Sequence, residues 1–218
     1  MTSKLGVVFL GYWVLICSGC ALDTLKHPLV DPAEAKPMPE LYGVYRTTEF
    51  KEGFLNYVHV ATAGGDYPPG FLRGVLVGQP RDPKTPVTVR GFVGFIEPLG
   101  RYHILHCPFP QEGVLEDQPK ISSPPNWKRQ DVTGYMAIRL EIGKESVEAS
   151  GLNREFIVNQ IRSGKLAGEV HMGEHPKTGE PRVSNVSITA KQKELRAFFE
   201  KHMDAGLFQE TSQTYRRI

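Results

Sequence analysis

The sequence has few cysteines, little excess charge of one sign and no apolar run long enough to span a bilayer. Its 26 basic and 24 acidic residues are interspersed and give a net charge of only +2. The clustered Lys and Arg of a nucleic-acid-binding surface are therefore missing, apart from the pair Arg216 and Arg217. A content of 40% hydrophobic and 23% charged residues is typical of an ordinary globular domain and excludes a disordered chain.

The longest apolar run lies at the N-terminus. Lys4 gives the start of the chain a positive charge, and residues 5–16 form an apolar stretch. A bilayer core needs about 20 apolar residues, so this stretch is too short to span one, but it suits the apolar region of a signal peptide. Cys17-Ser18-Gly19-Cys20 follows directly.

Two small residues before a cysteine resemble the lipobox of bacterial lipoproteins, although Cys17 stands where Leu is usual. The resemblance implies that residues 1–19 are a signal peptide and that Cys20 carries the lipid, because bulky Ile16 makes Cys17 a poor acceptor. Two or three acyl chains would hold the domain at a membrane. Ala21, in place of the Asp associated with inner-membrane retention, favours the outer membrane. An ordinary cleaved signal peptide and an uncleaved short anchor are the alternatives.

If Cys17 is removed and Cys20 is lipidated, Cys107 alone remains. The exported domain then has no internal disulfide and must be stabilised by its core. Residues 20–40 contain four prolines and are predicted to be a lipidated, proline-rich tether. Residues 41–218 are predicted to be a single β-rich domain, since 22 Gly and 17 Pro in the chain indicate many turns.

Short runs of β-forming residues alternate with turn clusters beyond residue 41. Alternation is clearest where Met136, Ile138 and Leu140 share one face while Arg139 and Glu141 face the other way. Tight connections such as the one at residues 98–100 favour antiparallel pairing of neighbouring strands. The predicted strands are 43–49, 55–62, 71–77, 87–97, 101–107, 134–142, 165–172 and 182–188.

Two helices are expected late in the chain. Asn153 can cap a helix over 154–163, which Gly164 would end. Thr189 and Gln192 have the spacing of a capping box before a second amphipathic helix. The fold class is therefore α+β: an antiparallel sheet or partly closed β-barrel of about eight strands with two helices packed on it. The proline-rich segment 108–133 is expected to be a long surface loop.

Two groups of residues could carry chemistry. His171 and His175 belong to an H-x-x-E-H pattern, which in zinc peptidases lies on a helix. The adjacent Pro176 and the turn at Gly179 instead favour the end of a strand entering a hairpin. His103 and Cys107 share a strand face but lie about 13 Å apart along it, too far for direct pairing. No catalytic residue, metal or cofactor is predicted.

Several segments resemble a family of lipoproteins from planctomycete-type bacteria. The segments that carry this resemblance are the lipobox, DPAEAKP, LYGVY, GYMAIRLEI, NQIRSGKLAGEV and TAKQKELRAFFEKH. The resemblance implies an envelope location and a β-rich fold, and it implies no activity. The start at Gly43-Val44-Tyr45 is also similar to the Gly-x-Trp of lipocalin-like barrels, with Tyr in place of Trp.

The sequence thus predicts a membrane-anchored envelope lipoprotein that acts as a non-enzymatic binding or structural module. Its expected partners are the membrane, through Cys20, and an envelope protein or a small apolar ligand, but not nucleic acid. Two alternatives remain open: an envelope hydrolase using histidines near His103 or His171, and a lipocalin-like carrier of a small ligand.

Overall fold

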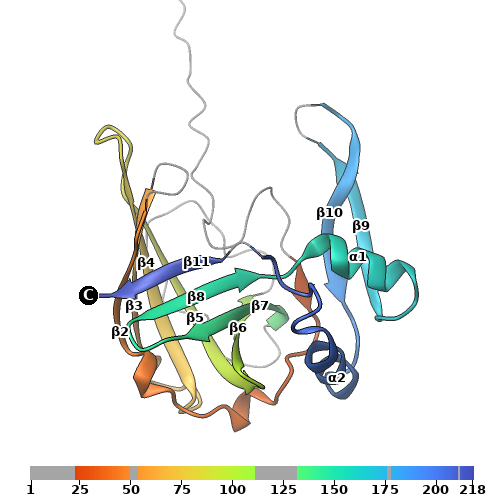
Figure 1. Cartoon of the computed structure of the whole chain (residues 1–218), viewed down its shortest axis with the longest axis horizontal. Helices are drawn as coiled ribbons and strands as arrows, with labels where there is room; N and C mark the ends of the chain where they lie inside the picture. Colours follow the sequence, from red (N-terminus) through yellow and green to blue (C-terminus); the bar gives the residue numbers. More distant parts are fainter. Residues whose placement is uncertain (1–22, 50–53, 111–131, 176–177, 211) are drawn as a thin grey trace, which may run out of the picture.

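Antiparallel strands close into a barrel in the computed structural model of the chain (Figure 1). The structure describes residues 23–49, 54–110, 132–175, 178–210 and 212–218. The predicted signal peptide, Cys20 and most of the predicted loop at 108–133 lie outside the described residues. Neither α-helix in the described part of the chain is long and apolar enough to cross a membrane.

Eight of the described strands form the barrel. Strands β2 to β8 pair in chain order, β6 also pairs with β7, and β11 lies between β8 and β2 and closes the ring. Every neighbouring pair in the ring is antiparallel. The bounds are β2 (Gly43–Thr47), β3 (Phe54–Thr62), β4 (Phe71–Pro80), β5 (Thr88–Leu99), β6 (Tyr102–Pro110), β7 (Val132–Ile142), β8 (Ser146–Gly151) and β11 (Gln213–Arg217).

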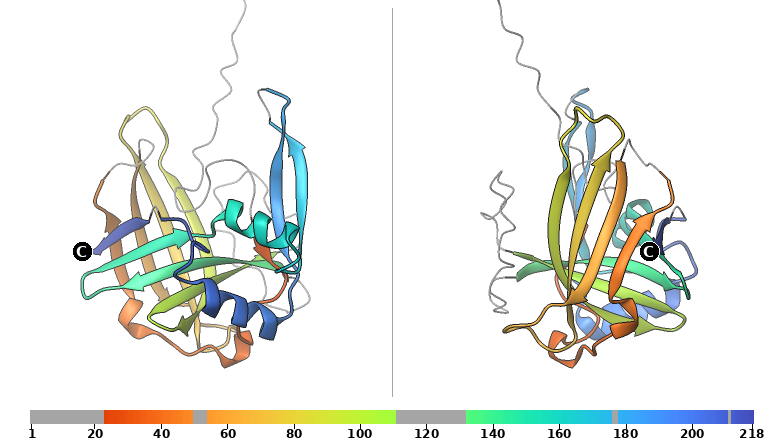
Figure 2. Two further views of the ribbon diagram at one scale, coloured as in Figure 1. Left: turned by 45° about the vertical axis from the view of Figure 1, so that its right-hand side comes forward. Right: turned by 90° about the vertical axis from the view of Figure 1, so that its left-hand side faces the viewer.

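A smaller group of elements lies against one side of the barrel. Strand β1 (Thr24–Leu25) pairs with β7 and runs parallel to β10 (Pro181–Ile188), which forms a hairpin with β9 (Gly168–Glu174). Helices α1 (Arg154–Arg162) and α2 (Gln192–His202) lie on the same side (Figure 2). Two short 3₁₀ helices, η1 (Pro32–Glu34) and η2 (Pro39–Leu41), lead into β2.

The predicted α+β fold with an eight-stranded barrel is confirmed, but two of the barrel strands differ from those expected. The predicted strands at 165–172 and 182–188 form the hairpin beside the barrel instead. Their places in the ring are taken by β8 and β11, which were not predicted. Both are short, and their sequences, SVEASG and QTYRR, contain few large apolar residues. Pairing partners on both sides stabilise them where local propensity does not.

The first predicted helix is confirmed together with its cap, whereas the predicted cap of the second is wrong. The Asn153 side chain accepts a hydrogen bond from the Phe156 N–H, and Gly164 follows the helix with φ of +70°. Helix α2 has Lys191 at its N-cap position with no side-chain cap. Thr189 instead uses its backbone N–H to bond the Ala167 carbonyl, because the chain is still leaving β10 at that point.

The predicted tether at 20–40 is wrong for its described part, residues 23–40, which pack on the barrel. Leu25 and Leu29 are fully buried, and Asp23 forms an ion pair with Arg154 at 2.9 Å. The Ala35 carbonyl oxygen lies 2.0 Å from where a Cβ on Gly70 would stand, so the segment directly contacts the backbone just before β4. The prolines shape turns that follow the surface, and the leucines between them supply the apolar contacts.

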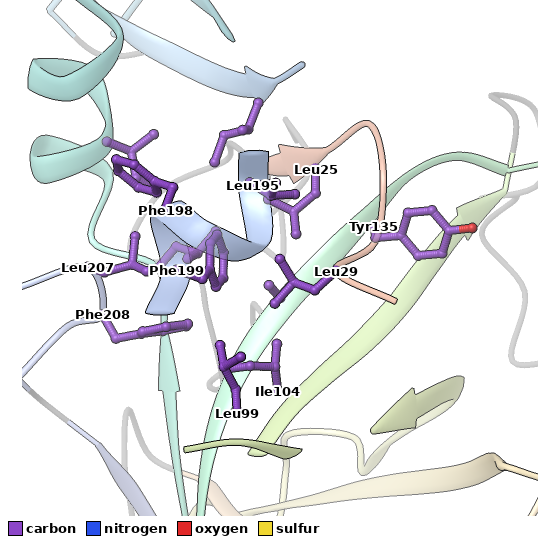
Figure 3. Close-up of a cluster of buried hydrophobic side chains, with 14 of the residues drawn as sticks. Leu25, Leu29, Leu99, Ile104, Tyr135, Leu195, Phe198, Phe199, Leu207 and Phe208 are labelled. Carbon is purple, nitrogen blue, oxygen red and sulfur yellow. The ribbon is translucent and has the colours of Figure 1, made fainter. Parts of the chain in front are cut away.

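The outer wall of the barrel carries a large apolar core, which we call the outer core. It joins side chains from the N-terminal segment, the outward faces of β5 to β7 and both helices (Figure 3). Leu195 and Phe199 from α2 are fully buried there beside Leu29. A second core fills the inside of the barrel. The barrel wall therefore separates two apolar environments, and each strand can place alternate residues in each of them.

Candidate functional site

Strict alternation along the strands lines the inside of the barrel with apolar side chains. Met136, Ile138 and Leu140 of β7 point inward, as their spacing predicted, while Tyr135 and Ala137 belong to the outer core. Cys107 and Leu105 of β6 point inward in the same way. An interior lined in this manner can either be filled by its own side chains or enclose a ligand.

This interior contains a cavity of about 90 Å³ whose wall is apolar throughout. All eight barrel strands and η2 contribute to the wall. The lining side chains are Leu41, Tyr45, Val58, Val60, Leu72, Phe92, Ile96, Leu105, Cys107, Met136, Ile138, Leu140, Val147, Ala149 and Tyr215. The space is larger than one water molecule needs. A buried water also requires two to four polar partners, and this wall offers none. It is therefore suited to an apolar group.

A glycine in β4 shapes one part of the wall. A Cβ on Gly74 would stand 2.0 Å from the far end of the Phe92 ring, which therefore lies close to the β4 backbone. Any larger residue at position 74 would push this ring away from the strand. Because Phe92 lines the cavity, Gly74 helps to set the cavity's width.

Polar residues gather on the inner face toward one end of the barrel. Thr47 lies opposite Tyr215 on β11, and its hydroxyl accepts a hydrogen bond of 2.9 Å from the Asn56 backbone N–H on β3. Gln213 precedes Tyr215 by two residues and so shares its face. We call Thr47, Asn56, Gln213 and Tyr215 the polar belt; all four are buried.

Three atoms of the polar belt have no hydrogen-bond partner among the described residues. They are Asn56 Nδ2, Gln213 Oε1 and the Tyr215 hydroxyl. Burial also raises the pKa of Tyr215, so its phenol is neutral. Tyr45, which lines the same cavity, differs because its hydroxyl donates to the Leu41 carbonyl at 3.0 Å. Buried polar atoms nearly always find a partner, so these three are available to hydrogen-bond a bound group.

The residues singled out on β6 do not form a nucleophilic site. Cys107 lines the cavity and His106 lies on the opposite face, because successive residues of a strand point to opposite sides. Burial raises the pKa of the Cys107 thiol to about 12, which keeps it protonated. His103 shares the inner face with Cys107, and burial lowers its pKa. His103 Nδ1 and both ring nitrogens of His106 have no hydrogen-bond partner among the described residues, so none of these atoms bonds the thiol.

His106 is enclosed in the outer core between Phe95 and Tyr135. Its Nε2 lies 3.8 Å from Glu97 Oε2, and Glu97 accepts a hydrogen bond from Arg196 of α2. A nearby carboxylate favours a charged imidazole, but complete burial dominates and lowers the pKa of His106 to about 3. The histidine is therefore neutral, and the Glu97–Arg196 pair joins α2 to the barrel wall.

His171 and His175 are not on a helix. His171 belongs to β9, and His175 lies in the turn toward β10, where its backbone N–H bonds the Glu180 carbonyl. Strand β9 is in the side hairpin, whereas His103 and His106 are in the barrel. In the residues that the structure describes, no group of His, Cys, Asp and Glu side chains could hold a metal ion.

Comparison with known proteins identifies no relative of this chain. No protein-family model, curated protein or solved structure matches the chain. The cavity and the polar belt are thus the features on which a function can be argued. Reasoning from the sequence did not find the belt, because Asn56 and Gln213 have no local pattern that marks them as inward-facing.

Proposed function

We propose that this protein is a lipid-anchored envelope protein that binds a small apolar ligand inside its barrel. The observation that carries the ligand-binding part is the apolar cavity lined by all eight barrel strands. A cavity of about 90 Å³ forfeits about 2 kcal/mol of packing at roughly 24 cal/mol per Å³. A ligand that fills the space would recover part of that free energy.

The size of the cavity limits the class of ligand. Pockets for drug-sized molecules measure about 300–1,000 Å³, several times the 90 Å³ of this one. The best fit is therefore a slim molecule, such as a single alkyl or acyl chain, rather than one with several fused rings. The dispersed histidines and the protonated Cys107 give no comparable support to a hydrolase.

The test titrates octane, a slim and uncharged chain, into the purified protein and obtains its affinity from the rise in melting temperature as the ligand concentration increases. Replacing Val58 with Phe places a ring inside the barrel, whereas the matched change at Val44 places one on the exposed outer face. We expect Val58→Phe to weaken binding at least tenfold and Val44→Phe to leave it unchanged. Equal affinities in all three proteins would contradict binding inside the barrel.

The lipid anchor is supported by the leader and the lipobox-like sequence before Cys20. Since the chain packs on the folded part from Asp23 onward, only Ala21 and Leu22 would separate it from the lipidated Cys20. The three steps from Cys20 to Asp23 reach about 10 Å. The barrel would then lie at the membrane surface, close to a source of acyl chains. Cys20→Ala should abolish metabolic lipid labelling, while Cys17→Ala should leave it intact. Labelling that persists in Cys20→Ala would disprove the anchor.

A further inference from the structure

The polar belt adds chemical detail to the proposed ligand. The inner surface of the barrel is apolar over the cavity and becomes polar at the level of Thr47, Asn56 and Tyr215. Tyr215 belongs to both regions. It lines the cavity, and because the wall is apolar it does so with its ring, while its hydroxyl lies beyond the wall and is buried.

The unpartnered atoms of the belt form a complementary set. Asn56 Nδ2 is a donor, Gln213 Oε1 is an acceptor and the Tyr215 hydroxyl is both. Each residue is less than one-tenth exposed. A buried polar atom without a partner costs about 1–3 kcal/mol. A ligand whose head group forms hydrogen bonds with these atoms should therefore bind more tightly than one without such a group.

The belt also limits the charge of that group. Its four residues are all neutral, and burial raises the pKa of Tyr215, which keeps the phenol from ionising. A buried ion without a counter-charge is strongly unfavourable. A phosphate or a quaternary ammonium therefore fits poorly, while a hydroxyl or a primary amide can donate and accept at the same time.

Resting on the proposed function, we infer that the barrel binds an alkyl chain ending in a neutral group that both donates and accepts hydrogen bonds, such as an alcohol. The alkyl chain of the ligand occupies the apolar cavity. Its polar head group passes the Tyr215 ring to reach Asn56, Gln213 and the Tyr215 hydroxyl. Gly78 lets the belt approach the β4 backbone closely, since a Cβ there would lie 3.3 Å from Asn56 Oδ1 and 2.5 Å from the Thr88 hydroxyl.

The experiment compares 1-octanol with octane, two ligands that share a chain and differ in the head. Affinities are measured on the full-length protein from the rise in melting temperature as the concentration of each ligand increases. In Tyr215→Phe the cavity keeps its ring and loses only the hydroxyl. We expect the ratio of the octanol Kd to the octane Kd to rise about fivefold, the equivalent of one neutral hydrogen bond.

Two further variants make the result specific. Tyr57→Phe removes a hydroxyl from β3, in a residue whose neighbours Asn56 and Val58 point inward, so its own side chain lies on the outer face. This variant should leave the ratio unchanged. Asn56→Leu removes the donor of the belt and should raise the ratio in the same direction as Tyr215→Phe, which tests the inference independently of the tyrosine.

The outcomes separate the two claims. If both ligands bind and neither belt variant changes the ratio, recognition of the head is wrong while the apolar site stands. If neither ligand binds the wild-type protein, both the site and the head recognition are wrong. A rise in the ratio confined to the two belt variants supports the inference.

Discussion

Two tyrosines that line the same cavity should respond in opposite ways to loss of their hydroxyls. The Tyr45 hydroxyl donates to the Leu41 carbonyl at 3.0 Å in a buried setting. Tyr45→Phe removes this bond and leaves the carbonyl unpaired, at a cost of about 1–3 kcal/mol. The Tyr215 hydroxyl is buried without a partner among the described residues. Tyr215→Phe removes the cost of burying this unpartnered hydroxyl, so the free energy of unfolding should stay constant or rise by about 1 kcal/mol.

Urea unfolding followed by circular dichroism measures both values without added ligand. For a domain of 150–250 residues, each 1 kcal/mol also shifts the melting temperature by about 2–4 °C, so calorimetry provides a second readout. The urea m-value should be the same in all three proteins, because neither substitution changes the surface exposed on unfolding. If Tyr215→Phe destabilises the protein as much as Tyr45→Phe does, the Tyr215 hydroxyl has a partner in the folded protein. The polar belt would then lose its role in binding.

Three other predictions concern the packed segment, the thiol and the enclosed histidine. Leu29→Ala should lower the free energy of unfolding by about 2–5 kcal/mol, because Leu29 is buried in the outer core, whereas Lys26→Ala at an exposed position should have little effect in the same urea assay. Cys107 should not react with Ellman's reagent at pH 8 in the folded protein, because burial raises its pKa to about 12, and should react fully in guanidinium. Burial lowers the pKa of His106 to about 3 in the folded state, against 6.5 when unfolded. The contribution of neutral His106 to the free energy of unfolding is therefore complete above pH 6.5. It is lost as the pH falls toward 3, by about 1.4 kcal/mol per pH unit. The free energy of unfolding of His106→Leu should depend less steeply on pH over that range.

Each of these has a result that would count against it. A Leu29→Ala protein as stable as the wild type would mean that the N-terminal segment contributes no packing energy. The thiol reaction is compared with Cys107→Ser, so a difference between the two proteins before unfolding would show that the barrel interior admits the reagent. An unchanged pH dependence in His106→Leu would mean that other groups dominate acid unfolding.

Local pattern was enough to predict the long strands and α1. Met136, Ile138 and Leu140 alternate with residues of the outer face, and Asn153 and Gly164 mark the ends of the helix in the sequence itself. The two missed barrel strands lack such a signal. Val147 and Ala149 in β8 and Tyr215 in β11 are too few to form a visible pattern, and their strand conformation depends on partners elsewhere in the chain.

The site was harder to predict than the strands because it depends on register. Tyr45 and Val58 meet across β2 and β3, and Tyr215 lies opposite Thr47 only because β11 closes the ring. A shift of one residue in any of these pairings would exchange the inner and outer faces of the strand. The prolines at residues 28–39 misled in a different way, since an extended spacer and a chain that turns along a surface have similar composition.

The position of β11 also governs how the protein can fold. Tyr45, at the start of the barrel, pairs with Arg217, one residue before the C-terminus. The last gap in the ring is filled by β11, so β2 and β8 present open edges until residues 213–217 are available. Such distant pairing is slow. A chain shortened at its C-terminus by even this one strand would keep most of its sequence and still expose two sheet edges that invite aggregation.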